Sequence, residues 1–576
     1  MPLKMRTSRP KPTLPDPSPS LFNPLLPFNQ VSNIENKVSE LQIANNKPSF
    51  LFSDIPSSTA STNIFPLTPT GTPMTKEMEE EKAFEEHMGL LTRTEGKQEL
   101  GDAITAPIFT MPVLEHVSRR LANETENPFA QYGLLAGVAR GFEETTDVEV
   151  DAMNADPRLF FNIASPSSTF ICGSQGSGKS HTLSCLLENS MFPAVANHLP
   201  HPLTGLVFHY DTFISDDGGS PCEAAFLSSN KGVKVRVLCA PTNIATIKLA
   251  YSQFKNITIE PLRINQSDLN TKRMLDLMAV TSSNGPIPLY VHTIYRILRV
   301  LREEQQKTGS KFDYVLFKKH VDAANLSPDQ LRPLQQRLDT LESFMPKEQT
   351  FAPHLKGKGK LRPPTGNDWT PKAGTLTIVD LSCPCVTPEG ACALFNICLS
   401  IFLEKSTSVG RVIALDEAHK YMNASSEAST LTETLLATIR LQRHLGARII
   451  ISTQEPTISP ALLDLSSVTI VHRFTSPEWL KTLEGHLAGA ASKLLLRTDD
   501  TEGGEQQISI ATKVFREIIK LRVGEALLFS PSAVIGVDEG AGKTGADALQ
   551  RLGAGFLKIR VRSRLTDDGG KSVMAV

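Results

Sequence analysis

The chain contains a strand, a glycine-rich loop and a helix in immediate succession, in the stretch FICGSQGSGKSHTL. The loop, Gly173–Ser180, matches the pattern G-x-x-x-x-G-K-[ST] in full. It follows the apolar run STFICG and opens an apolar helix that carries Leu183, Leu186 and Leu187. Glycines let successive backbone N–H groups turn toward one centre at a helix N-terminus, which makes an anion-binding nest. This order predicts a phosphate-binding loop at the end of a buried strand.

The loop predicts a site for ATP and Mg²⁺. Lys179 can reach the β- and γ-phosphates, which places it among the catalytic residues, and the Ser180 hydroxyl can complete a Mg²⁺ shell. The alternative is a Gly/Ser-rich turn that carries Lys-Ser by chance. This alternative is disfavoured because a strand directly precedes the motif and a helix directly follows it. The residues predicted to contact the nucleotide are Gly173, Ser174, Gln175, Gly176, Ser177, Gly178, Lys179, Ser180 and His181.

An acidic pair follows a second buried run, in RVIALDEAHKYM. We expect Asp416 to hold the Mg²⁺ and Glu417 to polarise the attacking water. Asp380, in TLTIVDLS, is the weaker candidate because no second acid follows it. Gln454 lies at the tip of the next run, ARIIISTQEP, where a polar side chain can hydrogen-bond the γ-phosphate or the attacking water. Gln454 is therefore a third candidate beside the acidic pair.

Long apolar runs separated by helical patterns characterise the chain from about residue 150 onward. Runs of this kind indicate parallel strands that are covered on both faces. The predicted class is α/β: a doubly wound, RecA-like P-loop NTPase fold with a mainly parallel sheet, a helical insertion and a disordered N-terminal region. A chain of 576 residues, 40% of them hydrophobic, is long enough for such a core.

Composition and pattern divide the chain into seven parts. Residues 1–107 are rich in Pro, Ser and Thr and then acidic, and we expect them to be disordered. A helical lead-in follows at 108–150. We expect an ATPase core in two halves: 151–264 with the P-loop, and 375–540 with the acidic pair. Between these halves lie a helical insertion at 265–346 and a basic loop or linker at 347–374, and the chain closes with a C-terminal tail that carries a basic strand, at 541–576.

The formal net charge of -2 gives no global bias toward nucleic acid. Two local patches could still contact DNA. One is the loop HLKGKGKLRPP at 354–364, and the other is the run LKIRVRSR at 557–564, whose basic residues alternate with apolar ones. The alternatives are a solvated loop and an edge strand that its charges protect from pairing.

The sequence shows neither a secretory signal nor an apolar stretch long enough to span a bilayer. Its eight cysteines do not resemble a disulfide framework, which fits a reducing compartment. We therefore expect a soluble intracellular protein that is not bound to a membrane and takes no small-molecule substrate beyond ATP. Nucleus and cytoplasm both stay open.

The letters DEAH at 416–419 also name a class of RNA helicases, but the spacing disagrees with that class. Lys179 and Asp416 lie 237 positions apart (416 minus 179), whereas those helicases place the two motifs much closer together. No LSGGQ-like signature precedes Asp416, which excludes ABC-type ATPases. The blocks GSQGSGKS, TIVDLS, LDEAH, IRLQRHLGARIIISTQEP, IVHRF and GEALLFSPS instead resemble the HerA/FtsK superfamily, in its HerA-like branch. The C-terminal KIRVRSRLTDDGG is similar to P-loop NTPases of filamentous fungi.

The resemblance implies a homo-oligomer, a hexameric ring with ATP between its subunits, that translocates DNA through the central pore. It also implies an arginine finger, for which Arg443 in LQRHLG is the candidate and Arg440 and Arg473 are alternatives. HerA-type proteins usually begin with a small β-barrel domain, whereas residues 1–150 show no such strands. A second hypothesis stays open: an ATP-dependent switch or scaffold that assembles partners through its N-terminus and translocates nothing.

Overall fold

The computed structural model describes part of the chain, which divides into two compact units, Met1–Ala83 and Phe84–Val576. No residue of the first unit is described, so the disorder expected at 1–83 lies outside the described residues, as does the lysine-rich loop at 354–364. The disorder expected up to residue 107 is wrong at 95–105, which form the helix α2 (Glu95–Thr105) with Ala103 buried in a small core. The described residues of the second unit are 84–85, 87–88, 95–121, 128–139, 156–215, 218–278, 288–350, 365–405, 408–483, 510–538 and 548–569.

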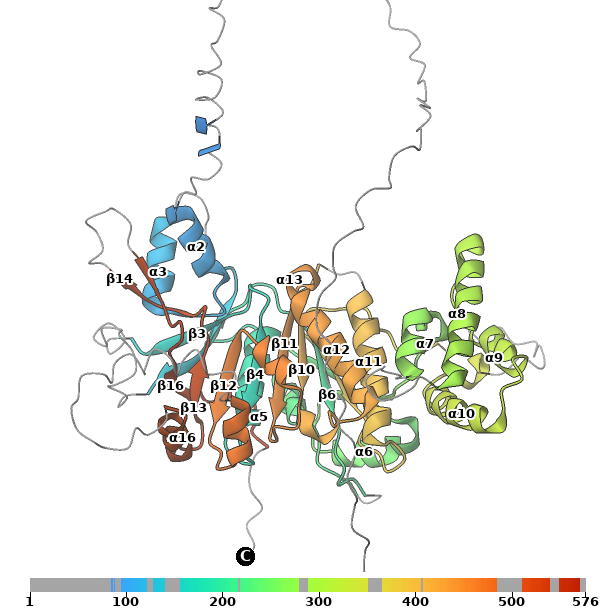
Figure 1. Cartoon of the computed structure of the whole chain (residues 1–576). Coiled ribbons are helices and arrows are strands. Elements are labelled where there is room, and N and C mark those ends of the chain that lie inside the picture. The colour runs from blue at the N-terminus through green and yellow to red at the C-terminus, as the bar shows by residue number, and fades with distance from the viewer. Residues whose placement is uncertain are drawn as a thin grey trace, which may run out of the picture. The chain divides into compact units, whose positions relative to one another are not determined.

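A parallel sheet forms the centre of the second unit (Figure 1). Its strands lie in the order β12-β4-β11-β10-β6-β9-β7-β8, and all neighbouring pairs are parallel. Every residue of β4, β6, β10 and β11 is buried, as expected for apolar strands covered on both faces. The predicted α/β class with a mainly parallel sheet is confirmed. The bounds are β4 (Ser168–Cys172), β6 (Thr204–His209), β7 (Lys234–Cys239), β8 (Ile257–Pro261), β9 (Thr375–Asp380), β10 (Arg411–Leu415), β11 (Ala447–Thr453) and β12 (Val468–His472).

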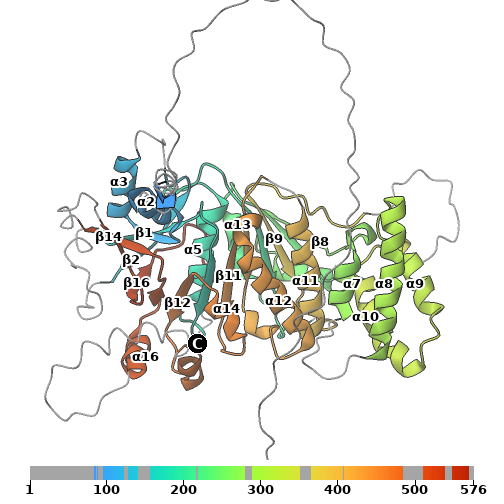
Figure 2. The ribbon, with the colours of Figure 1, turned by 45° about the horizontal axis from the view of Figure 1, so that its top comes forward.

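Helices cover both faces of this sheet (Figures 1 and 2). Successive residues of a strand point to opposite faces. In β10, Val412 and Ala414 pack in the core that contains α5. Ile413 and Leu415 pack in the other core, with α11 and α12. The bounds are α5 (Lys179–Met191), α6 (Ile244–Ala250), α11 (Pro388–Glu404), α12 (Ser426–Arg440), α13 (Gln442–Leu445), α14 (Pro460–Asp464), η1 (Glu223–Ser229), η2 (Pro241–Asn243) and η6 (Ala418–Lys420).

A group of helices stands at one end of the sheet, in the part of the chain between β8 and β9 (Figure 2). The described residues of 265–346 contain helices and no strand. In α10, Leu334, Leu338 and Leu341 are buried, which orients this helix toward the core. None of the helices in the described part of the chain is both long enough and apolar enough to cross a membrane. The bounds are η3 (Gln266–Asp268), α7 (Thr271–Met278), α8 (Leu289–Thr308), α9 (Tyr314–Asp322), α10 (Pro328–Ser343) and η5 (Lys347–Gln349).

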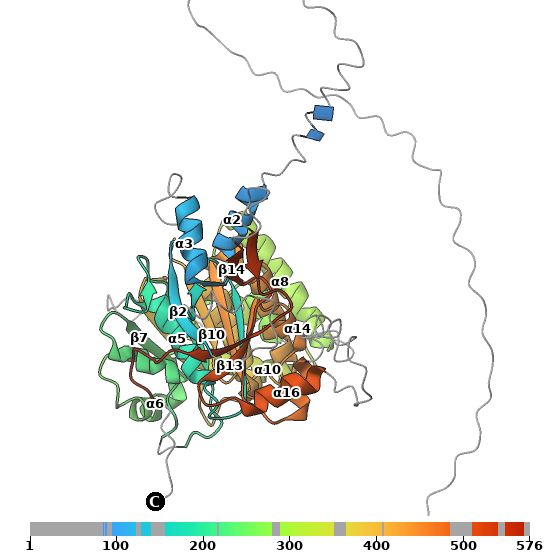
Figure 3. The same cartoon turned by 90° about the vertical axis from the view of Figure 1, so that its left-hand side faces the viewer.

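A mainly antiparallel wing extends the sheet beyond β12, in the order β12-β13-β16-β2-β3-β1-β14-β15, with β5 beside β2 (Figure 3). The helical lead-in expected at 108–150 is therefore wrong in part: its described residues form the strands β1 and β2 as well as the helix α3. Phe109 of β1 lies opposite Val534 of β14, and local periodicity does not reveal partners so far apart. The bounds are α2 (Glu95–Thr105), β1 (Ile108–Thr110), α3 (Met111–Arg120), β2 (Tyr132–Val138), β3 (Arg158–Asn162), β5 (Asn197–His198), α16 (Ile510–Lys520), β13 (Glu525–Phe529), β14 (Val534–Asp538), β15 (Ala548–Arg551) and β16 (Leu557–Val561).

The first five residues of the basic run LKIRVRSR form an internal strand, β16. β16 pairs with β13 on one side and with β2 on the other. The expectation of an edge strand is therefore wrong, and so is that of a C-terminal tail at 541–576, because this strand belongs to the sheet. The side chains of Arg562 and Arg564 are only 7% and 3% exposed, and each is paired with a carboxylate. These two arginines are therefore not free to form the DNA-binding face that the sequence suggested.

Candidate nucleotide site

The carboxyl ends of three neighbouring parallel strands bring the phosphate loop, the acidic pair and Gln454 to one edge of the sheet. Thr453 of β11 lies beside Cys172 of β4, so the phosphate loop and Gln454 start at the same level. Asp416 directly follows β10, the next strand. This is the edge at which open parallel α/β sheets bind ligands.

The phosphate loop has a backbone that glycine alone tolerates at two points. Gly178 caps α5 in the left-handed region, with a φ of 114°. At Gly173 an added Cβ would lie 2.7 Å from the Cβ of His472. The side chain of the loop lysine is buried. Lys179 is 3% exposed, and its Nζ donates a hydrogen bond to the carbonyl of Ser174 at 3.0 Å. The loop is therefore closed around its own lysine.

The acidic pair forms one electrostatic unit with the loop lysine. Glu417 has a left-handed backbone, with a φ of 47°, and its carboxylate accepts a hydrogen bond from the side-chain amide of Gln454. Burial and the negative charge of Asp416 raise the pKa of Glu417, and Lys179 opposes this rise. Burial lowers the pKa of Lys179, and the two carboxylates oppose that shift in turn. Coupling of this kind is typical of catalytic clusters.

His419 holds Gln454 from the other side, a role that the sequence left unassigned. The main-chain N–H of Gln454 donates to Nδ1 of His419 at 3.3 Å, and Nε2 of the same ring lies 3.6 Å from a carboxylate oxygen of Glu417. Burial lowers the pKa of His419 to about 4, so the ring is neutral near pH 7. The indole N–H of Trp479 donates to the carbonyl of Gln454 at 2.7 Å. Gln454 is thus fixed by both neighbours.

The surroundings of Asp416 suit Mg²⁺. Asp416 is 3% exposed, and among the described residues its Oδ1 has no hydrogen-bond partner, nor does the Oγ of Ser177 in the loop. A buried carboxylate oxygen without a partner, beside a phosphate loop, is a ligand that the oxygen-preferring Mg²⁺ accepts. Asp380, the weaker candidate, is occupied instead: its carboxylate accepts from the Tyr251 hydroxyl at 2.6 Å and from a main-chain N–H at 3.0 Å.

The three candidate arginine fingers lie at different places. Arg443 is exposed in α13, which precedes β11, so it lies at the edge of the sheet opposite to its own phosphate loop. Arg440 is exposed at the end of α12. Arg473 is also exposed but directly follows β12, and its carbonyl accepts from the N–H and the hydroxyl of Ser174 at 2.9 and 2.8 Å. Only Arg473 therefore touches the phosphate loop of its own chain.

His472 packs against the phosphate loop and the start of α5, a contact that the sequence did not predict. Its ring is fully buried, with Nε2 2.9 Å from the hydroxyl of Thr182 and Nδ1 3.0 Å from the carbonyl of Glu525. Burial lowers the pKa of His472 to about 4. A neutral ring with one donor and one acceptor matches these two partners.

This lowered pKa predicts a pH-dependent stability. Between about pH 6.5 and 4 the unfolded chain binds a proton at His472 that the folded protein does not, so the free energy of unfolding falls as the pH falls. At about pH 5 the expected loss from this residue is about 2 kcal/mol relative to neutral pH. Urea unfolding at both pH values should show a smaller loss in His472→Gln than in the wild type. The exposed His444→Gln serves as control, and an equal loss in all three proteins would contradict the prediction.

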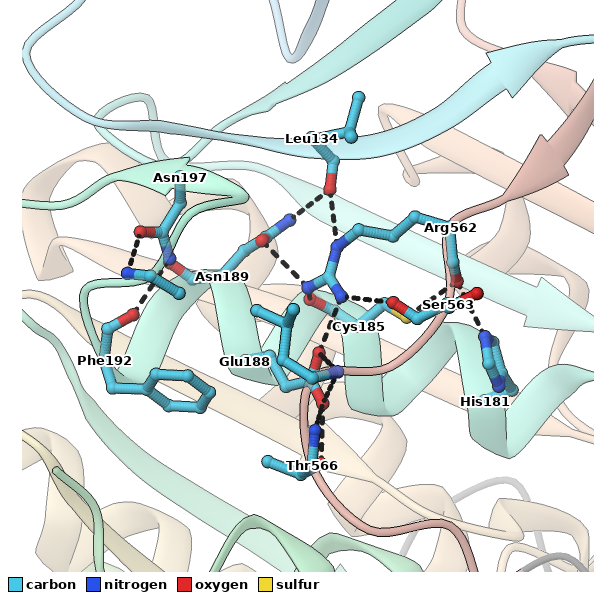
Figure 4. A network of polar contacts seen from close by, with 12 residues as sticks. Leu134, His181, Cys185, Glu188, Asn189, Phe192, Asn197, Arg562, Ser563 and Thr566 are labelled. Atoms are coloured by element: carbon cyan, nitrogen blue, oxygen red, sulfur yellow. Dashed lines mark hydrogen bonds and ion pairs between the residues drawn. The ribbon is translucent and has the colours of Figure 1, made fainter. Parts of the chain in front are cut away.

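The segment after β16 lies against α5, the helix that starts in the phosphate loop (Figure 4). The guanidinium of Arg562 donates to Glu188 at 2.7 Å and to the carbonyls of Leu134 and Cys185 at 2.9 and 3.1 Å. The ring of His181, predicted to contact the nucleotide, lies 2.8 Å from the carbonyl of Arg562 and so faces this segment. The residues are far apart in the sequence, and no local signal predicts their contact.

Comparisons with known proteins give matches among solved structures alone, since neither a family model nor a curated protein matches the chain. VirB4 of Thermoanaerobacter pseudethanolicus has a TM-score of 0.43 at 11% identity, over 75% of this chain and 96% of that chain. The genome packaging NTPase B204 from Sulfolobus turreted icosahedral virus 2, in complex with AMPPCP, has a TM-score of 0.24 at 10% identity, over 63% of this chain and 92% of that chain. EssC (ATPases 2 and 3) from Geobacillus thermodenitrificans has a TM-score of 0.24 at 12% identity, over 75% of this chain and 48% of that chain. By the geometry of its own sheet edge, the chain has an α/β P-loop fold.

Proposed function

We propose that this chain is a P-loop NTPase of HerA/FtsK type that binds and hydrolyses ATP. The observation that carries the proposal is the position of Glu417, whose carboxylate is held by Gln454 and coupled to Lys179 at the phosphate loop. A carboxylate fixed beside an anion-binding loop has the two features that water attack on a phosphoryl group needs, a base and a positive counterpart.

In the proposed reaction, the loop N–H groups and the Lys179 ammonium bind the phosphates of ATP. A water molecule attacks the γ-phosphorus, its proton passes to Glu417, and the bond to the β-phosphate oxygen breaks to release ADP and phosphate. Gln454 holds the Glu417 carboxylate in place through its side-chain amide. Ser180 and Asp416 would hold Mg²⁺, which when bound neutralises charge on the phosphates.

Replacing Lys179 with Ala tests the nucleotide site directly. We expect ATP affinity to fall by at least about tenfold, because the variant lacks the buried cation that faces the phosphates. Titration with a fluorescent ATP analogue measures this loss. The exposed Lys481→Ala, outside the site, should bind as the wild type does. Unchanged affinity in a folded Lys179→Ala protein would overturn the proposed site.

We further infer that the active form is a homo-oligomer, a hexameric ring that moves DNA. The inference is supported by the sequence blocks shared with the HerA/FtsK superfamily. It is also supported by Arg443, which is exposed at the edge opposite to its own phosphate loop and so can reach only the nucleotide of another subunit. An arginine supplied by a neighbour stabilises the charge that develops on the phosphates.

The test measures the ATPase rate with and without double-stranded DNA, together with the mass by light scattering. A motor shows a ring of about six subunits and a rate that rises with DNA. Mixing Arg443→Ala subunits with Glu417→Gln subunits should then restore part of the activity, because each supplies what the other lacks. A monomer whose basal rate ignores DNA would instead favour the alternative function, an ATP-dependent switch or scaffold.

A further inference from the structure

A cluster of side chains that could bind a second metal ion contains Asp416, the Mg²⁺ candidate, together with His209 and Cys222. His209 is the last residue of β6, and Asp416 follows β10, the strand beside it. Cys222 directly precedes η1, in the connection between β6 and β7. All three side chains are buried, with exposed fractions of 4%, 0% and 3% for His209, Cys222 and Asp416.

The main chain of Cys222 is fixed by an outer ring of hydrogen bonds. Its N–H donates to the hydroxyl of Tyr251 at 2.9 Å, and that hydroxyl donates to the carboxylate of Asp380 at 2.6 Å. These contacts tie η1 to the end of α6 and to β9. Outer partners of this kind orient the ligands of protein metal sites.

Two of the three distances between the ligand atoms are close to those of a tetrahedral site. Nδ1 of His209 and Sγ of Cys222 lie 3.2 and 3.7 Å from Oδ2 of Asp416, and all three atoms lie within 4.8 Å of one another. Around Zn²⁺, with bonds of about 2.0–2.1 Å to N and O and about 2.3 Å to S, such ligands lie about 3.3–3.6 Å apart. One ion fits between them with little movement.

We propose that His209, Cys222 and Asp416 form a binding site for Zn²⁺. The donor set selects the metal: one imidazole nitrogen, one thiolate and one carboxylate suit Zn²⁺ and Co²⁺, whereas Mg²⁺ requires oxygen ligands. The thiolate and the carboxylate together balance the two positive charges. On binding, the thiol proton leaves to solvent, and the proton that Nδ1 of His209 shares with Asp416 leaves these two atoms.

The site shares one residue with the proposed ATPase without using the same atom. Oδ2 of Asp416 faces His209 and Cys222, whereas Oδ1 has no partner among the described residues. The same carboxylate can therefore bind a Zn²⁺ through Oδ2 and leave Oδ1 available for the Mg²⁺ of the proposed ATPase. The Zn²⁺ site does not depend on ATP hydrolysis, so its test omits the nucleotide.

The experiment uses the full chain, stripped of metal by a chelator and titrated with Co²⁺ in the absence of ATP and Mg²⁺. We expect one Co²⁺ per chain, the visible spectrum of tetrahedral Co²⁺ and a near-ultraviolet band from the cysteine thiolate. Zn²⁺ should abolish both signals and Mg²⁺ neither. Cys222→Ser should lose the near-ultraviolet band and bind Co²⁺ more weakly, by at least the roughly 10- to 100-fold that loss of an outer partner costs.

Two further cysteines provide matched controls. Cys398→Ser changes a buried thiol of α11, and Cys385→Ser removes the exposed thiol that could bind Co²⁺ at the surface. Both variants should keep the band. No band in the wild type, or a band that survives Cys222→Ser but not Cys385→Ser, would overturn the proposal. Should Cys222→Ser not fold, X-ray absorption of the Zn²⁺-loaded wild type decides: one sulfur at about 2.3 Å supports the site, and its absence refutes it.

Discussion

ATP hydrolysis by the Glu417→Gln variant should be slower than that of the wild type by about 10²- to 10⁴-fold in kcat, the range that a general base contributes. The amide keeps the shape of the side chain but does not accept the proton of the attacking water. ATP affinity should stay close to that of the wild type, because the phosphate loop and Lys179 are unchanged. Because burial and Asp416 raise the pKa of Glu417, the wild-type rate should fall on acidification at a pH above 4.5, the ordinary value for glutamate.

A phosphate-release assay and binding of a fluorescent ATP analogue separate the two effects. Glu455→Gln is the matched control, since Glu455 is exposed and follows Gln454 at the same edge of the sheet. It should hydrolyse ATP at the wild-type rate. A Glu417→Gln protein that retains its full kcat would show that another residue activates the water.

The second large effect is on stability. Replacing Arg562 with Ala should lower the free energy of unfolding by about 3–5 kcal/mol, because it leaves the carboxylate of Glu188 buried without its charged partner. Glu188 is 0% exposed, and Arg562 contacts it at 2.7 Å. The hydroxyl of Thr566 still donates to Glu188, at 2.6 Å, but supplies no positive charge.

Urea unfolding followed by circular dichroism measures this loss as a lower midpoint with an unchanged slope. The control is Arg560→Ala, which changes an exposed arginine of β16, two residues before Arg562. It should change the free energy of unfolding by less than about 0.5 kcal/mol. If Arg562→Ala were no less stable than this control, the C-terminal segment would not hold α5.

The phosphate loop and the acidic pair were predictable because their determinants lie close together in the chain. A strand, eight loop residues from Gly173 to Ser180 and a helix follow one another without interruption, so the local pattern contains the whole motif. The same holds for the buried parallel strands, which appear as continuous apolar runs. The partnership of Glu417 with Gln454 could be expected in part, since parallel strands bring their carboxyl ends to one edge.

The antiparallel wing shows why the rest was not predictable. The strand β2 contains two glycines and lacks a clear alternating period, and the charges of β16 are typical of an edge strand although it is internal. Each of them finds its partners far away in the chain. Strand pairing between distant segments depends on the folded arrangement, which a local pattern does not contain.

The sequence alone therefore determined the fold class, the phosphate loop and the acidic pair, Asp416 and Glu417, that follows a buried strand. Only the tertiary structure decided what surrounds them: His472 under the loop, His419 on Gln454, Cys222 and His209 behind Asp416, and Arg562 on the loop helix. The physical reason is that local backbone preferences and apolar periodicity act between near neighbours in sequence. The burial and pairing of polar side chains instead depend on which distant segments meet.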